Sequence, residues 1–112
     1  MKGIDVHAVL EDLPLAPDPY AASLALGVSA HQIEHDDRIR RYLRKDWTFE
    51  RTALLDRLVL RLALEELVYH DDVPLAVAID EAVELAKQFS TDDSGRFVNG
   101  ILSAMGAEIR PK

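Results

Sequence analysis

Apolar side chains recur every three or four residues along most of this chain, which restricts it to helical folds. The clearest repeat is a seam within residues 19–45, formed by Tyr20, Leu24, Val28, His31, His35, Ile39 and Tyr42. The apolar side chains are mostly Leu, Ala and Val, and β-branched or aromatic runs with period two are absent from the sequence. We therefore predict an all-α protein, folded as a compact helical bundle.

Turn and capping residues divide the chain into five expected helices within one domain, residues 1–112. A short helix and a linker would occupy residues 1–16, and residues 107–112 would form a loose tail. The helices are expected at Val6–Leu13, from Asp18 to about Asp46, from Thr48 to about His70, at Pro74–Phe89 with Asp72 as the N-cap, and from the polar loop 90–95 to Gly106.

The composition, with 48% apolar and 29% charged residues, is typical of a soluble globular domain. The chain has no cysteine, which excludes disulfides and thiolate metal sites. No apolar run approaches the roughly 18 to 20 residues that span a bilayer, and residues 1–12 lack the core of a signal peptide. We therefore expect a cytoplasmic protein without membrane association.

The net charge of −7 argues against indiscriminate binding to polyanions, but the charge is unevenly distributed. Residues 1–37 carry about −6, residues 38–61 about +5 and residues 62–112 about −6. The basic segment contains Arg38, Arg40, Arg41, Arg44 and Lys45. On a helix these cations would form two adjacent ridges, either as a solvated helix end or as a patch that contacts phosphates.

Residues 31–35 read His-Gln-Ile-Glu-His, which matches the inverted zinc-protease signature. Two histidines four residues apart can share a helical face and bind zinc, with the glutamate polarising a water molecule. The sequence offers no clear third ligand, and both histidines fall on the apolar seam. The preferred interpretation is a pair of core or subunit-facing histidines, and no metal site is predicted.

Other candidate chemistry is weak. The carboxylate pairs Glu65-Glu66 and Asp71-Asp72 could suggest acid–base catalysis, but solvated surface positions are the preferred interpretation. The serines lack a nucleophile-elbow context, and the scattered glycines form no phosphate-binding loop. We therefore predict neither enzymatic activity nor a cofactor.

A polar loop that enters a helix at Asp93, Ser94, Gly95, Arg96 and Phe97 is more informative. Free backbone N–H groups and the helix dipole at such a position favour anions. Arg96 could reach a phosphate, and Phe97 could stack on an unpaired base. Alternatively, Phe97 is a core residue and Asp93 only a cap.

The stretch from Asp71 to Gly100 resembles the NusB family of bacterial transcription antitermination factors. The matching residues are Asp72-Val73-Pro74, Val77-Ala78-Ile79, Asp80 to Lys87, Asp93-Ser94, Phe97 to Gly100 and Leu102. Weaker matches extend the resemblance over about Tyr20 to the C-terminus: Gly27-Val28 with His31, Trp47-Thr48, Asp56-Arg57, Leu60 to Ala63, Glu66-Leu67 and Ile109 to Pro111.

This resemblance implies two packed helical halves and an adaptor function. Such a protein binds single-stranded boxA RNA of ribosomal RNA operons together with NusE, a ribosomal small-subunit protein, within the RNA polymerase antitermination complex. The residues expected to touch RNA are Asp93, Ser94, Arg96 and Phe97. Asp56 and Arg57 are expected on the helix that faces NusE.

The chain departs from the family pattern in two ways. Family members normally begin with an arginine-rich segment and a helix before the point where this chain starts, so the first helix is expected to be missing, and Glu65 stands where Tyr is common. Phosphate contacts by arginine supply much of RNA affinity, and an uncovered apolar surface could drive homo-oligomerisation. The alternative function is therefore a protein-interaction module that keeps the NusE-binding surface but has lost RNA recognition. An appendage of an RNA methyltransferase ranks lower.

Overall fold

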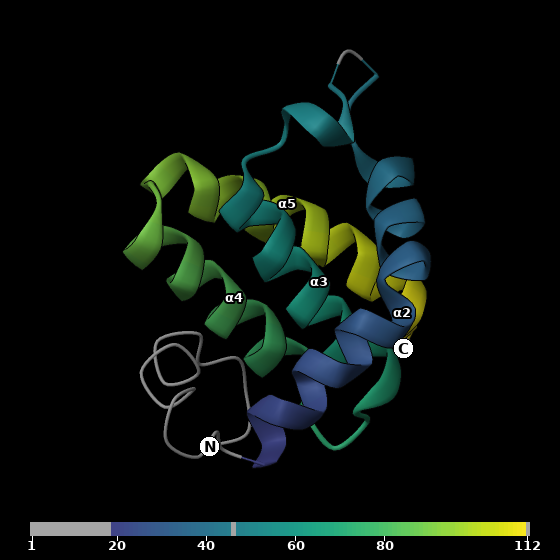
Figure 1. The fold of residues 1–112 in the computed structure, drawn as a ribbon. Helices are drawn as coiled ribbons and strands as arrows, with labels where there is room; N and C mark the ends of the chain where they lie inside the picture. Colours follow the sequence, from purple (N-terminus) through teal and green to yellow (C-terminus); the bar gives the residue numbers. More distant parts are fainter. Residues whose placement is uncertain (1–18, 46, 112) are drawn as a thin grey trace.

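The computed structural model describes residues 19–45 and 47–111, and all regular structure in this part is helical. The described residues form four α-helices and one short 3₁₀ helix: α2 (Pro19–Tyr42), η1 (Phe49–Arg51), α3 (Leu54–Tyr69), α4 (Leu75–Phe89) and α5 (Asp92–Ile109). Figure 1 shows their arrangement. The all-α prediction is confirmed. The helix expected at Val6–Leu13 lies outside the described residues.

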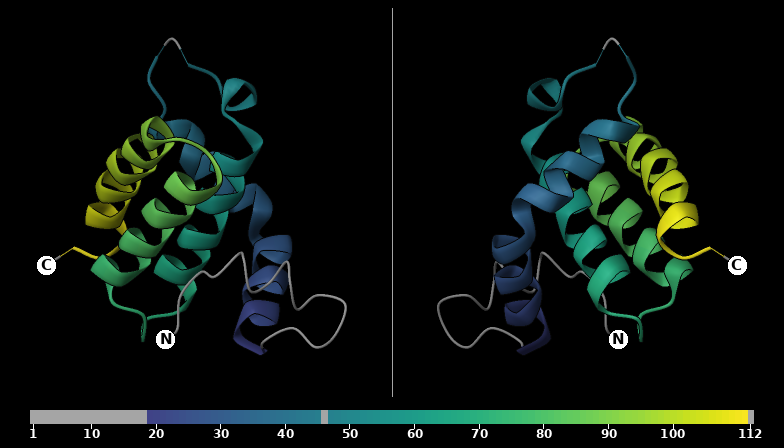
Figure 2. Two further views of the ribbon diagram at one scale, coloured as in Figure 1. Left: turned by 90° about the vertical axis from the view of Figure 1, so that its left-hand side faces the viewer. Right: turned by 90° about the vertical axis from the view of Figure 1, so that its right-hand side faces the viewer.

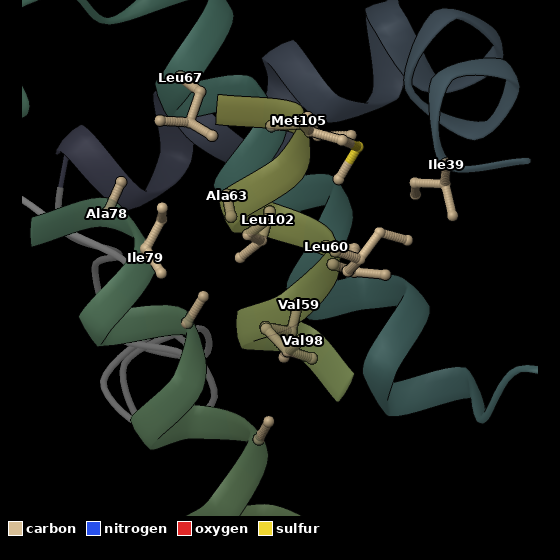
Figure 3. Packing of buried hydrophobic residues seen from close by; sticks show 14 of the residues in the cluster. Ile39, Val59, Leu60, Ala63, Leu67, Ala78, Ile79, Val98, Leu102 and Met105 are labelled. Atoms are coloured by element: carbon tan, nitrogen blue, oxygen red, sulfur yellow. The ribbon is translucent and has the colours of Figure 1, made fainter. Parts of the chain in front are cut away.

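Helix α3 lies at the centre of the molecule and packs against α2, α4 and α5. Figure 2 shows α3, α4 and α5 side by side, with α2 lying along the opposite side of α3. The buried side chains between these helices are mainly Leu, Ile, Val and Ala (Figure 3). Ile39 of α2, Leu60 and Leu64 of α3, and Leu102 and Met105 of α5 are fully buried. These side chains belong to one core that the three helices share.

The seam predicted for α2 is confirmed. Leu24, His35 and Ile39 are buried, and the other members of the seam are partly buried. The helix departs from helical geometry at His31, where φ is −113° and ψ is 17°, and it ends at Tyr42. Because the helix stops before Arg44 and Lys45, the predicted pair of basic ridges does not form.

Helix starts differ from the expected capping residues at two places. Thr48 is an N-cap, but of η1, where its hydroxyl accepts a hydrogen bond from the Arg51 N–H at 3.3 Å. Helix α3 begins after Ala53, without a side-chain cap. Helix α4 follows Pro74, and Asp72 makes no cap there, because the helix starts two residues later than an Asp72 cap requires.

The C-terminal part is more ordered than predicted. Thr91 caps α5 by accepting a hydrogen bond from the Ser94 N–H at 3.0 Å, and Gly106 lies buried inside the helix. Within the tail expected at 107–112, α5 continues to Ile109. Arg110 then donates hydrogen bonds to the carbonyl oxygens of Glu66, Leu67, His70 and Val73, around the end of α3.

The two glutamates of α3 are also buried, contrary to the predicted solvated surface. Glu65 is 2% exposed and Glu66 is fully buried, because α2 packs over this face of α3. Tyr20 donates a hydrogen bond to Glu66 at 2.7 Å, and burial raises the pKa of Glu66 to about 7. Asp71 and Asp72 are exposed, as predicted.

Two further observations concern the surface. Phe89, predicted to face the core, is 38% exposed at the end of α4. None of the described helices combines the length and the apolar character that crossing a bilayer requires.

Candidate nucleic-acid interface

A solvent-open pocket lies where the segment before α3 meets the start of α5. Its empty volume is about 480 Å³. Two segments that are distant in sequence, 47–56 and 91–97, form its wall, which consists of Trp47, Thr52, Ala53, Asp56, Thr91, Asp93, Ser94 and Phe97. The fold therefore gathers Asp56 and three of the four predicted RNA-binding residues into one surface feature.

Asp56 and Ser94 connect the two sides of the pocket. The Ser94 hydroxyl donates a hydrogen bond to Asp56 Oδ2 at 3.2 Å and lies 2.9 Å from the hydroxyl of Ser90. Asp56 is only 6% exposed, and its Oδ1 has no hydrogen-bond partner among the described residues. Asp56 was predicted on a separate protein-binding surface, but it lies beside the predicted RNA-binding residues.

Burial dominates the electrostatics of this carboxylate. Loss of solvent raises the pKa of Asp56 above its usual range, and the hydrogen bond from Ser94 opposes this shift only in part. The unpaired Oδ1 is itself buried, so it is an acceptor that the described residues leave unsatisfied behind the pocket wall.

Phe97 and Arg96 differ in their exposure. Phe97 is partly buried against the core, so its ring is both a core contact and part of the pocket wall. Arg96 is exposed and forms an ion pair with Asp93, one turn before it on α5. The ion pair offsets the positive charge, but an exposed pair of this kind opens at little cost.

The start of α5 is less favourable to anions than the sequence suggested. The Thr91 hydroxyl already accepts from the Ser94 N–H, and Asp92 and Asp93 place carboxylates in the first turn. These groups satisfy the positive end of the helix dipole internally. A phosphate is therefore more favourably bound at the arginines around the pocket than at the helix end itself.

Trp47 is a pocket residue that the prediction from sequence missed. Its ring is 40% exposed, its Nε1–H donates to Thr52 Oγ1 at 3.2 Å, and the Arg51 guanidinium lies 4.9 Å from the ring centroid. The sequence shows that the tryptophan is present but not that it is exposed. Its exposure is the informative signal, because large aromatic side chains are uncommon on surfaces without a binding function.

Comparison with known proteins decides the family. The model of the NusB family matches residues 5–107. The chain belongs to the NusB family. Curated relatives named transcription antitermination protein NusB include those of Geobacillus kaustophilus, 50% identical over 83% of this chain and 71% of the relative, and of Limosilactobacillus fermentum, 48% identical over 86% and 72%. The solved NusB structure of T. maritima is 38% identical, with a TM-score of 0.79 over 94% of this chain and 77% of that chain.

Within this NusB-family fold, an arginine cluster surrounds a buried aromatic ring next to the pocket. The guanidinium groups of Arg40, Arg57 and Arg61 lie 4.5, 5.3 and 5.7 Å from the centroid of Phe49. Arg61 also donates two hydrogen bonds to Asp36, at 2.7 and 3.0 Å. Arg57, the second residue predicted to face a partner, is therefore held against Phe49 and is only partly exposed.

The basic residues between positions 38 and 45 form two groups. Arg38 and Arg40 are partly neutralised, Arg38 by Glu108 at 3.8 Å and Arg40 by Asp37 and Glu50 at 3.4 and 3.5 Å. A second group, at and beyond the end of α2, is exposed: Arg41, Arg44 and Lys45. This second group has the exposure that a phosphate-contacting patch needs.

Proposed function

We propose that this chain is an RNA-binding transcription antitermination factor that acts with NusE on boxA RNA of ribosomal RNA operons. It would act as a non-catalytic adaptor within the RNA polymerase antitermination complex. The observation that carries the proposal is the pocket, which combines two accessible aromatic rings, Trp47 and Phe97, with the Asp56–Ser94 pair. Membership of the NusB family supports the same function.

Each part of the pocket has a role in this proposal. Trp47 and Phe97 would stack on unpaired bases, which typically contributes about 1–3 kcal/mol for each base. Asp56 and Ser94 would accept hydrogen bonds from base edges and so distinguish between bases. Arg51 and Arg96 would contact phosphates beside the stacked bases.

A protein partner would occupy a neighbouring surface of α3. Leu54 and Leu58 lie one helical turn apart and are 61% and 42% exposed, next to Arg57. Exposed leucines beside an arginine are suited to the apolar centre and polar rim of a protein interface. We assign this strip, together with Arg57, to NusE.

The test is a fluorescence-anisotropy titration of a boxA-containing RNA with and without NusE. Phe97→Leu retains apolar volume but removes the aromatic face. At position 47, Trp47→Ala removes the ring and Trp47→Phe retains one, so these two variants are a matched pair. We expect Phe97→Leu and Trp47→Ala to weaken binding about 5- to 100-fold, the range equivalent to one lost stack. Trp47→Phe should retain most of the affinity.

Three further variants localise the contacts. Arg96→Gln should weaken RNA binding, whereas Arg41→Gln, at the end of α2, tests whether the basic patch contributes. Leu58→Ser should weaken binding to NusE while leaving binding to RNA alone unchanged. If the purified protein bound neither RNA nor NusE, alone or combined, the proposal would be rejected.

Binding to NusE without any RNA contribution would instead favour the protein-interaction module. In that case Phe97→Leu and Arg96→Gln would leave the only activity unchanged. The carboxylates of Asp92 and Asp93 close to the pocket are the structural feature that favours this outcome, because they repel phosphates.

A further inference from the structure

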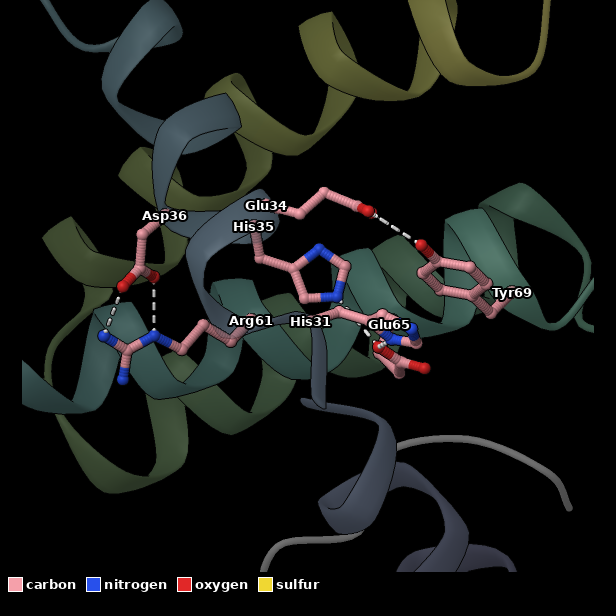
Figure 4. A network of polar contacts seen from close by, with 7 residues as sticks. All are labelled: His31, Glu34, His35, Asp36, Arg61, Glu65 and Tyr69. Carbon is pink, nitrogen blue, oxygen red and sulfur yellow. Dashed lines mark hydrogen bonds and ion pairs between the residues drawn. The ribbon is translucent and has the colours of Figure 1, made fainter. Parts of the chain in front are cut away.

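Three side chains with metal-ligating atoms converge between α2 and α3, outside the pocket. The His31 Nδ1 and His35 Nε2 atoms lie 3.1 and 2.8 Å from Glu65 Oε1. The ligating atoms of all three residues lie within 4.8 Å of one another. Figure 4 shows both imidazole rings directed from α2 toward the carboxylate on α3. Glu65 therefore supplies the third potential ligand, which the sequence alone did not reveal.

The convergence follows from the helix geometry. His31 and His35 are four residues apart, which places them on one face of α2. The departure from helical φ and ψ at His31 changes the direction of the helix between its two halves. Glu65 lies on the opposing face of α3, which packs against α2.

Neighbouring residues hold this arrangement in place. The ring of Tyr69 stacks on the ring of His31, with centroids 4.0 Å apart and planes at 13°. A Cβ atom at Gly27 would lie 2.2 Å from Glu65 Oε2, so the glycine leaves the space that the carboxylate occupies. Metal ligands are commonly oriented by neighbouring residues that do not themselves bind the metal.

The charge balance of the cluster favours a cation. The Glu65 side chain is only 3% exposed, and within residues 19–45 and 47–111 its ion-pair and hydrogen-bond partners are the two histidines, not lysine or arginine. Buried carboxylates are paired with cations or coordinate metals. The contacts of the two imidazoles with one carboxylate oxygen bring potential metal ligands, rather than a permanently charged side chain, to the buried carboxylate.

We propose that His31, His35 and Glu65 form a binding site for a zinc ion. Two imidazoles and one carboxylate are a common zinc ligand set, which leaves a fourth position for water. Tetrahedral coordination with bonds of about 2.1 Å places ligand atoms about 3.4 Å apart. The two separations between a histidine nitrogen and Glu65 Oε1, 3.1 and 2.8 Å, are shorter than this value, so small side-chain movements would admit the ion. His31 is 34% exposed, which gives the ion access from solvent.

This site would join helices and would not hydrolyse peptides. In the zinc-protease signature the glutamate polarises the zinc-bound water. Here that residue, Glu34, is exposed and accepts hydrogen bonds from the Tyr69 hydroxyl at 2.8 and 2.9 Å. A zinc ion would therefore cross-link α2 to α3, independently of RNA binding.

The experiment uses the full chain without an affinity tag, stripped of metal with a chelator. Zinc is titrated by calorimetry, bound metal is counted by elemental analysis, and Co²⁺ is added as a spectroscopic probe. We expect one zinc per chain, visible absorption bands of tetrahedral Co²⁺, and a higher melting temperature with zinc.

Three variants assign the ligands. Glu65→Gln keeps the shape of the side chain but removes its charge, and His31→Gln alters the more exposed histidine, so both should fold. Each should weaken zinc binding at least 100-fold. His70→Gln is the matched control, because His70 follows the end of α3, outside the cluster, and should leave binding unchanged.

Two results would contradict the zinc site. If the folded wild-type chain takes up no stoichiometric zinc, the histidines only donate hydrogen bonds to Glu65 and the proposal is wrong. It is also wrong if Glu65→Gln and His31→Gln bind zinc as tightly as the wild type. Circular dichroism of each variant shows whether a loss of binding reflects a loss of fold.

Discussion

At the scale of single residues, the buried carboxyl of Asp56 makes the stability of the fold depend on pH. Burial raises the pKa of its carboxyl above the usual 3.8, so the folded state binds the proton more tightly than the unfolded state. The associated stability is complete below pH 3.8 and is lost as the pH rises through the folded-state pKa. The buried charge therefore opposes folding at neutral pH.

Asp56→Asn should consequently be at least as stable as the wild type at pH 7, while still accepting a hydrogen bond from Ser94. The difference in free energy of unfolding should increase in favour of the variant as the pH rises from about 4 to 7. Urea denaturation at several pH values measures this difference. If the difference changed in the opposite direction, a cation must stabilise the carboxylate.

Arg110 is the second residue with a large expected effect on stability. It donates to four carbonyl oxygens around the end of α3. A hydrogen bond to a charged group contributes about 1.5–3 kcal/mol net, and the four bonds share one guanidinium, so their contributions do not add. We expect Arg110→Ala to lower the free energy of unfolding by about 2–3 kcal/mol, measured by urea denaturation. Arg110→Lys keeps the charge but not the planar set of donors, and should recover less than half of the loss.

At the scale of helices, two starts that lie side by side are capped differently. Thr91 accepts a hydrogen bond at the start of α5, whereas Ala53 has no side chain that can cap α3. Thr91→Ala should lower the free energy of unfolding by about 1 kcal/mol, and Ala53→Ser should raise it by a similar amount. Thermal unfolding of both variants and of the double variant provides the comparison, and equal melting temperatures would contradict it.

The helical repeats and the turn residues predicted the existence of α2 to α5 and the buried face of α2, because an amphipathic face is encoded locally. The ends were less predictable. Gly106 resembled a stop signal, but it is buried within α5, where a Cβ atom would lie 2.7 Å from Leu75. Its role depends on how closely α4 approaches, which no local pattern encodes.

At the scale of the whole molecule, the candidate sites depend on segments that are distant in sequence. Phe97 and Ser94 were predictable from a loop that enters a helix, whereas Trp47 and Glu65 acquired meaning only when packing placed them beside α5 and α2. Glu65 was predicted on the surface because charged residues are rarely buried without a partner. Its partners, His31 and His35, lie on another helix.

The overall charge limits how RNA binding can depend on salt. With a net charge of −7, the molecule gains little from long-range attraction, and phosphate contacts must come from a few local arginines. We expect a shallow slope of about −2 in a plot of log affinity against log salt concentration, because each contact to single-stranded RNA contributes about −0.7. Anisotropy titrations over a range of salt measure the slope, and Arg96→Gln should reduce its magnitude by about 0.7.

The hydrogen bonds of Arg110 also have a consequence for the order of events during protein synthesis. The carbonyl groups that it binds belong to residues 66–73, which are translated well before Arg110. Until Arg110 is added, these carbonyl groups have only their local backbone partners and water, and the connection between α3 and α4 lacks the four hydrogen bonds that close it. A chain that ended before Arg110 would therefore contain the residues of every described helix and still leave this connection more open to proteolysis.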